Sequence, residues 1–231
     1  MAHRKYAAPK RRRTAFAKRR RAPRRAGGPN TTVARTKFGI GDQLFCKLKY
    51  WDHHRYSITG PDVAGNARSF QSSLRDPDLS GTGTQPQFYD QLMAMYNKYQ
   101  VLAMKVRMTV ANASAIPALI GSGFSDTIVT PVAVGDMAFY KYMRVKQVPG
   151  VGGPVTRITH YITAKKINGQ AAVTQMDNED GTDSTDPSDR FYFYVNVAPA
   201  NLTGSDTVNV DVNTEITYYA RFFEQKVATL S

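Results

Sequence analysis

The 231-residue sequence has a single cysteine, Cys46, and no long apolar run. One cysteine excludes a disulfide within the chain, which is consistent with a reducing compartment. No apolar segment like that of a secretory signal peptide follows the basic N-terminus, and no stretch approaches the roughly 18 apolar residues of a membrane-spanning helix. We therefore expect neither secretion nor a membrane partner.

The sequence also lacks the short motifs of common enzyme classes. It contains no Gly-x-x-x-x-Gly-Lys phosphate loop, no Gly-x-Gly-x-x-Gly dinucleotide turn and no Gly-x-Ser-x-Gly nucleophile elbow. The four histidines, His3, His53, His54 and His160, form no His-Glu-x-x-His set or other metal-ligand spacing. We expect no catalytic residues, no metal site and no cofactor, and we predict that the protein is not an enzyme.

Acidic residues are missing from the first 41 positions, since the first carboxylate is that of Asp42. Fourteen of the 31 Lys and Arg residues precede it, so residues 42–231 hold 17 basic and 18 acidic residues and carry a net charge of −1. A block of like charge with few large apolar residues cannot bury enough surface to offset its backbone entropy. We predict two parts, a disordered basic arm at 1–37 and a folded domain at 38–231.

The arm is dense in arginine, whose planar guanidinium suits phosphate oxygens. The residues predicted to bind nucleic acid are Arg4, Lys5, Lys10, Arg11, Arg12, Arg13, Lys18, Arg19, Arg20, Arg21, Arg24 and Arg25. Two Lys-Arg-Arg-Arg tetrads within this set are also typical of nuclear-localisation signals. The predicted localisation residues are Lys10, Arg11, Arg12, Arg13, Lys18, Arg19, Arg20 and Arg21. Whether import and nucleic-acid binding use the same residues stays open.

The folded part alternates apolar and polar residues with a period of two, which is typical of half-buried strands. This pattern predicts strands at 102–110, 190–198 and 208–222, and weaker ones at 42–51 and 154–167. A helix is predicted within 87–99, after Pro86, and a second, short helix near 134–142. The apolar positions predicted to share the face of the first helix are Phe88, Leu92, Met95, Tyr96 and Tyr99.

Long connections rich in Gly, Pro, Ser and Asp separate these elements, at 60–87, 111–135, 147–154 and 176–189. Long connections between alternating strands are typical of a sandwich whose chain crosses repeatedly between two sheets. The predicted fold class is therefore all-β, an antiparallel jelly-roll sandwich with one or two short helices in its connections. Six carboxylates within 177–189 predict a solvated loop, the alternative being a calcium site or a contact with basic residues of a neighbouring subunit.

Several segments resemble the capsid proteins of circovirus-like, small circular single-stranded DNA viruses. They are the basic arm, 86–110, 161–173, 190–199 and 214–226, and they follow one another in the order of that family. The resemblance implies an eight-stranded jelly roll and a viral genome bound by the arm. It implies sixty identical subunits that close an icosahedral T=1 shell, which is the virion. It also implies a host nucleus as the place of assembly, the nuclear import machinery as a partner, and a host receptor that the sequence does not identify.

Other classes stay open. The capsid protein of a small RNA virus would share the fold and the arm, because contacts to phosphate do not distinguish RNA from DNA. A cellular nucleic-acid-binding structural protein would also have a basic arm, but such proteins usually carry a basic stripe on the folded part as well, which a net charge of −1 disfavours. A β-sandwich enzyme or lectin with a basic tail is disfavoured by the missing site motifs.

Overall fold

The computed structural model describes residues 41–60, 67–81, 83–128, 133–169, 180–201 and 206–226. These ranges contain nine strands and three short helices, all in the unit Gly39–Ser231. The strands are β1 (Gln43–Thr59), β2 (Arg68–Gln71), β3 (Tyr96–Asn112), β4 (Ala118–Ser125), β5 (Met143–Val148), β6 (Thr156–Thr163), β7 (Asp180–Thr182), β8 (Tyr192–Pro199) and β9 (Thr207–Gln225). The helices are α1 (Tyr89–Met93), α2 (Val134–Met137) and α3 (Ala164–Ile167). Among the described residues, none of these helices has the length and apolar character needed to cross a membrane.

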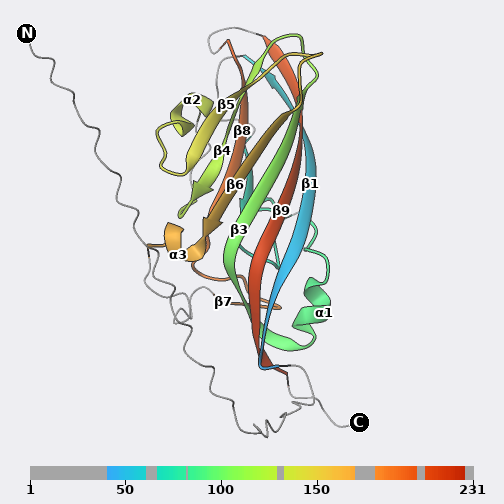
Figure 1. Ribbon diagram of the computed structural model, residues 1–231, viewed down its shortest axis with the longest axis vertical. Coiled ribbons are helices and arrows are strands. Elements are labelled where there is room, and N and C mark those ends of the chain that lie inside the picture. Colours follow the sequence, from blue (N-terminus) through green and yellow to red (C-terminus); the bar gives the residue numbers. More distant parts are fainter. Residues whose placement is uncertain are drawn as a thin grey trace, which may run out of the picture. The chain divides into compact units, whose positions relative to one another are not determined.

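Two antiparallel sheets hold these strands. The long sheet has the order β1-β9-β3-β6, with β7 added beside β3, and the short sheet has the order β2-β8-β4-β5. Figure 1 shows β6, β3, β9 and β1 side by side, with β5, β4 and β8 belonging to the other sheet.

The strand pairing identifies the topology. Apart from β7, the first strand pairs with the last, the second with the second-last, the third with the sixth and the fourth with the fifth. A long hairpin rolled into a two-sheet sandwich produces this pairing, and the result is a jelly roll. The predicted all-β, eight-stranded antiparallel jelly roll is confirmed, with β7 as an addition to it.

The alternation of β9 confirms the strongest of the strand predictions. All of its predicted inward positions are buried, namely Val208, Val210, Val212, Ile216, Tyr218 and Phe222. In β8 both faces are buried, because Tyr192 and Tyr194 pack with Met137 and Met143 on the side away from the other sheet. Strand β1 also alternates as predicted, and it continues well beyond 51 to Thr59.

One inward position of β3 was wrongly predicted. The pairing with β9 shifts by one residue between Val101 and Ala103, as it does at a β-bulge. Val101, opposite Ala220, therefore faces the core and Leu102 is only half-buried, whereas Met104 and the alternate residues after it point inward as predicted. A single inserted residue reverses which parity faces the core.

The helix predicted within 87–99 is too long. Helix α1 covers only five residues, Tyr89–Met93, and its N-cap has no side-chain hydrogen bond. Tyr96 and Tyr99 belong instead to β3, where both are fully buried, and Phe88 is 61% exposed. Aromatic side chains also favour half-buried strands, so their spacing alone does not distinguish a helix from a strand. Pairing with β9 places these two tyrosines in a strand.

The strand predicted at 154–167 is likewise too long at its end. Strand β6 ends at Thr163, whose hydroxyl accepts a hydrogen bond from the backbone N–H of Lys166 at 3.2 Å. Threonine is a favoured helix N-cap because it satisfies such an amide. The chain therefore turns into α3 over Ala164–Ile167.

Four segments predicted as connections contain or overlap strands. They hold β2, β4, the end of β5 and β7. Strand β4 escaped prediction because Gly121 and Gly123 weaken its strand pattern. Both glycines allow close packing: a Cβ atom on Gly121 would collide with the Met137 side chain, and one on Gly123 with the backbone of Tyr142 and Met143. The short helix predicted near 134–142 is present as α2, over Val134–Met137.

Candidate nucleic-acid and subunit interfaces

All twelve predicted nucleic-acid-binding residues, and the eight localisation residues among them, lie at 4–25, outside the described residues. Their roles stay predictions. The 17 basic residues of the folded part, in contrast, are all described, so their distribution can be compared with the sequence argument.

The basic residues of the folded part are unevenly distributed. Six lie on the outer face of the long sheet, the face turned away from the short sheet, in the part that runs from the row of Lys47 and Tyr219 to the row of Thr59 and Thr207. Arg221 and Lys98 also face outward, but beyond the Lys47 end of this part, past the bulge of β3. Only two carboxylates share the part with the six cations, those of Asp211 and Glu215. We call this surface the basic face, and its cations are Lys47, Lys49, Arg55, Lys105, Arg107 and Arg157. It has a net charge of +4.

The basic face corrects an inference made from the sequence. A net charge of −1 for residues 42–231 argued against a basic stripe, but the average conceals charges that are separated in space. The signal was present in the alternation of the strands, since these cations occupy the polar positions between buried residues. The folded part does carry a basic surface, so the argument from net charge against a cellular nucleic-acid-binding protein no longer holds.

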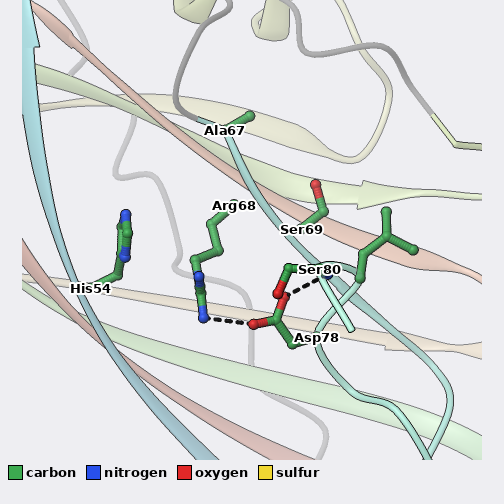
Figure 2. A pocket seen from close by; sticks show the side chains of 7 residues that line it. His54, Ala67, Arg68, Ser69, Asp78 and Ser80 are labelled. Atoms are coloured by element: carbon green, nitrogen blue, oxygen red, sulfur yellow. Dashed lines mark hydrogen bonds and ion pairs between the residues drawn. The ribbon is translucent and has the colours of Figure 1, made fainter. Parts of the chain in front are cut away.

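A polar cluster outside that face surrounds Arg68. Its guanidinium donates to Asp78 Oδ2 at 2.6 Å and to Asp52 Oδ2 at 3.0 Å, and the Asp78 side chain is 1% exposed. Figure 2 shows Arg68 directed at Asp78, whose other oxygen accepts from the backbone N–H of Ser80. Because Asp52 lies on β1 and Arg68 on β2, the ion pairs join the two sheets.

A hollow of about 370 Å³ lies beside this cluster, lined in part by His54, Arg68 and Asp78. Burial, followed by the positive charge of Arg68, lowers the pKa of His54. Both carboxylates are engaged by Arg68, so the hollow offers neither a free carboxylate base nor an unpaired cation for an anion. We interpret it as a structural feature.

A second buried pair, Ser122 and His160, resembles part of a catalytic triad. Ser122 Oγ lies 2.9 Å from His160 Nε2, but Ser122 is fully buried and the aromatic rings of Phe124 and Phe193 contact the imidazole. A nucleophile needs access to its substrate, which this serine lacks. Since Ser122 lies on β4 and His160 on β6, the hydrogen bond links the short sheet to the long sheet.

The environment of His160 predicts a pH dependence of stability. Burial, aided by the positive charge of Arg144, lowers the pKa of His160 from the usual 6.5 to about 4. Unfolding at acid pH therefore takes up a proton, so stability is full above about pH 6.5 and falls by on the order of 3 kcal/mol towards pH 4. In denaturant titrations across this range, His160→Gln should lose less stability than the wild type.

The exposed ring of His53 provides the control for that experiment. The variant His53→Gln should keep the pH dependence of the wild type. If His160→Gln and the wild type lost the same free energy of unfolding between the two pH values, His160 would not be the group responsible.

The acidic segment is described over 180–189. Asp183 and Asp189 are exposed, as expected for a solvated loop. Asp186 is not, because it accepts hydrogen bonds from Ser73 Oγ at 2.7 Å and from Arg190 Nη1 at 3.3 Å. Gly181 packs directly on the ring of Tyr99. Within the described part of the chain, no three His, Cys, Asp or Glu residues are grouped so that they could hold a metal ion.

No protein-family model and no curated protein matches the sequence. Solved structures that are similar to the chain include several from viruses. A chain of Desmodium yellow mottle tymovirus is 15% identical over 87% of this chain and 100% of its own, with a TM-score of 0.35. A chain of a semi-empty virus-like particle of the giant freshwater prawn Macrobrachium rosenbergii nodavirus is 10% identical over 81% of this chain and 97% of its own, with a TM-score of 0.45. A chain of mud crab tombus-like virus is 12% identical over 90% of this chain and 96% of its own, with a TM-score of 0.43.

Proposed function

We propose that the protein is a viral capsid protein that assembles with identical copies into a closed shell and packages a single-stranded genome. The observation that carries this proposal is the placement of positive charge on a jelly roll. Fourteen basic residues and no acidic ones lie in residues 1–41, just before β1, and β1 itself forms one edge of the long sheet with its basic face. Jelly rolls occur in shell-forming proteins as well as in lectins and cupins, so the fold alone does not distinguish these functions. The charge distribution is what supports a capsid protein over the others.

The two parts have complementary electrostatic tasks in such a container. Sixty arms with 14 basic residues each would bring on the order of 800 positive charges, which neutralise a large part of a strand of about a thousand nucleotides. A folded part with a net charge of −1 can pack beside its copies without strong repulsion.

The resemblance of the sequence supports finer proposals within this class. They are a circular single-stranded DNA genome, a sixty-subunit T=1 shell, assembly in the host nucleus after import through the arm, and a host receptor bound by the virion. A small RNA virus is the alternative, since the arm would bind either backbone. Nucleic acid extracted from purified particles should be digested by deoxyribonuclease and resist ribonuclease. The opposite result would establish the alternative.

A cellular nucleic-acid-binding protein is the second candidate, and the basic face favours it. Particle formation separates the two functions. We expect the full chain and a chain lacking 1–37 to form closed particles of one size in electron microscopy, with a clearly higher ratio of absorbance at 260 and 280 nm for the full chain. Nucleoprotein complexes without a closed shell would favour the cellular candidate.

Contacts between copies need apolar surface that the single chain leaves exposed. Phe139 is 88% exposed and the adjacent Tyr140 is 40% exposed, both between α2 and β5. In the following connection, Val151 and Val155 are 64% and 53% exposed. Large exposed aromatic side chains are typical anchors of protein interfaces.

We predict that Phe139→Ser prevents or strongly reduces particle formation. Its side chain has little contact with its own chain, so the free energy of unfolding should stay within about 0.5 kcal/mol of the wild type. The fraction of protein in particles is measured by sedimentation. Asp136→Ser, at an exposed neighbouring position in α2, is the control and should assemble normally. Normal assembly of Phe139→Ser would exclude this residue from the contact.

A further inference from the structure

The basic face is a regular array of side chains whose register is known. One row across the long sheet contains Trp51, Glu215, Arg107 and Thr159, each directly opposite the next. The neighbouring row contains Lys49, Thr217, Lys105 and Tyr161. Adjacent strands lie about 4.8 Å apart, so cations from β1, β3 and β6 are within the reach of one extended ligand.

Aromatic rings stand at both edges of this array. Trp51 on β1 is 62% exposed and Tyr161 on β6 is 56% exposed. The Trp51 ring lies nearly parallel to that of His53, with centroids 6.2 Å apart and an interplanar angle of 12°. Trp51, Arg107 and Arg157 line a hollow of about 350 Å³, in which Glu215 is the one carboxylate. The fold does not need these rings exposed, since the core lies on the other side of the sheet.

The cations of the face are only partly neutralised. Arg55 forms a two-pronged ion pair with Asp211, at 2.7 and 2.9 Å. Glu215 is shared by Lys49 at 3.5 Å and Arg107 at 3.8 Å.

Three further cations, Lys47, Lys105 and Arg157, have no carboxylate within salt-bridge distance among the described residues. A positive surface with exposed aromatic rings is the combination that binds single-stranded nucleic acid. Cations neutralise the backbone, and rings stack on unpaired bases.

We propose that the basic face is a second binding site for single-stranded nucleic acid, in addition to the arm. Lys47, Lys105 and Arg157 contact phosphates, and Trp51 stacks on an unpaired base. The role of this contact in packaging rests on the proposed function, but the binding itself does not. The chain passes from the last cation of the arm, Lys37, to the start of β1 at Gln43 within six residues, so one strand of nucleic acid can reach both.

A second copy of the chain is a less suitable occupant. A symmetric contact between two basic faces would bring two surfaces of net charge +4 together, which is repulsive. Double-stranded nucleic acid would satisfy the cations but leave Trp51 and Tyr161 without bases to stack on.

The tryptophan itself provides the test, because Trp51 is the only tryptophan in the protein. The full chain, purified free of nucleic acid in high salt, is titrated with a labelled oligothymidylate at several salt concentrations. Tryptophan emission and anisotropy of the label are followed together, and particle formation is scored separately by electron microscopy. We expect emission to be quenched along the same binding curve as the anisotropy.

Charge variants extend the test. Lys47→Gln, Lys105→Gln and Arg157→Gln combined should reduce the log-log salt slope by about 2 and abolish the quenching. The matched control combines Lys141→Gln, Lys165→Gln and Lys166→Gln. It removes three cations that lie outside the basic face, one just before β5 and two in α3, and should leave the quenching unchanged. Trp51→Ala should weaken binding about 5-fold to 150-fold, the equivalent of one stacked base.

Binding seen by anisotropy with unchanged tryptophan emission would overturn the proposal and leave the arm as the binding element. A change in emission on assembly without nucleic acid would assign the face to a contact between copies, which also overturns it. Quenching without particle formation would leave the face intact as a binding site and count against the capsid function instead.

Discussion

Particles of a chain in which residues 10–13 and 18–21 are replaced by glutamine should contain little nucleic acid. Eight cations are removed, and each phosphate contact with a single strand contributes about 0.7 to the log-log salt slope. An arm with about ten contacts contributes roughly −7 to the slope, so the slope of this variant should be smaller in magnitude than that of the wild type by about 5 to 6. The measurements are the ratio of absorbance at 260 and 280 nm of purified particles and a salt titration with a single-stranded oligonucleotide.

The matched control keeps the charge and changes only the chemistry. Replacing the six arginines of the two tetrads by lysine leaves eight cations in place, so the salt slope should stay near that of the wild type. Fused to a fluorescent reporter, the glutamine variant should also accumulate less in the nucleus. Unchanged packaging by the glutamine variant would remove the arm from its proposed role.

Replacing Arg68 by methionine should cost about 3 to 5 kcal/mol of unfolding free energy. The arginine neutralises Asp78, whose side chain is 1% exposed, and Asp52, whose side chain is 14% exposed. Methionine leaves two carboxylates facing each other in the interior without a counter-charge. Chemical denaturation of unassembled protein measures the loss, which should shrink at acid pH because protonation of the carboxyl groups removes the buried charge.

Arg55 is the matched control for this prediction. It forms the same two-pronged pair, with Asp211, but its side chain is 62% exposed. Arg55→Met should therefore leave the free energy of unfolding close to that of the wild type, because solvent screens an exposed ion pair. Adding Asp52→Asn and Asp78→Asn to Arg68→Met should restore part of the lost stability. Equal losses for the two methionine variants would show that the buried ion pairs do not hold the sheets together.

The fold class could be predicted because period-2 alternation survives in the strands that form most of the core. In β9, residues such as Val210 and Ile216 alternate with polar neighbours over the whole strand, since one side faces the core and the other faces outward. Local pattern failed where tertiary contacts decide. Gly121 and Gly123 disguise β4 as a loop because their role is to admit Met137 and the backbone of β5.

The candidate sites also divide into a part that is visible in the sequence and a part that depends on the fold. The positive charge of the arm is evident from composition alone, since it has no acidic residue to offset its cations, and its role stays a prediction. The basic face is not evident from composition, because it depends on which strands are neighbours. Lys49, Lys105 and Arg157 are far apart in the sequence and share one face only through the order β1-β9-β3-β6. Net charge averages over such an arrangement and conceals it.

Native mass measurement of the purified full-length chain, combined with electron microscopy, tests the central claim most directly. The proposed capsid function predicts closed particles of one size whose protein mass is about 1.5 MDa, corresponding to sixty copies of the 25.7 kDa chain, with nucleic acid inside. A monomer of 25.7 kDa under every salt and pH condition, with or without single-stranded nucleic acid, would contradict it.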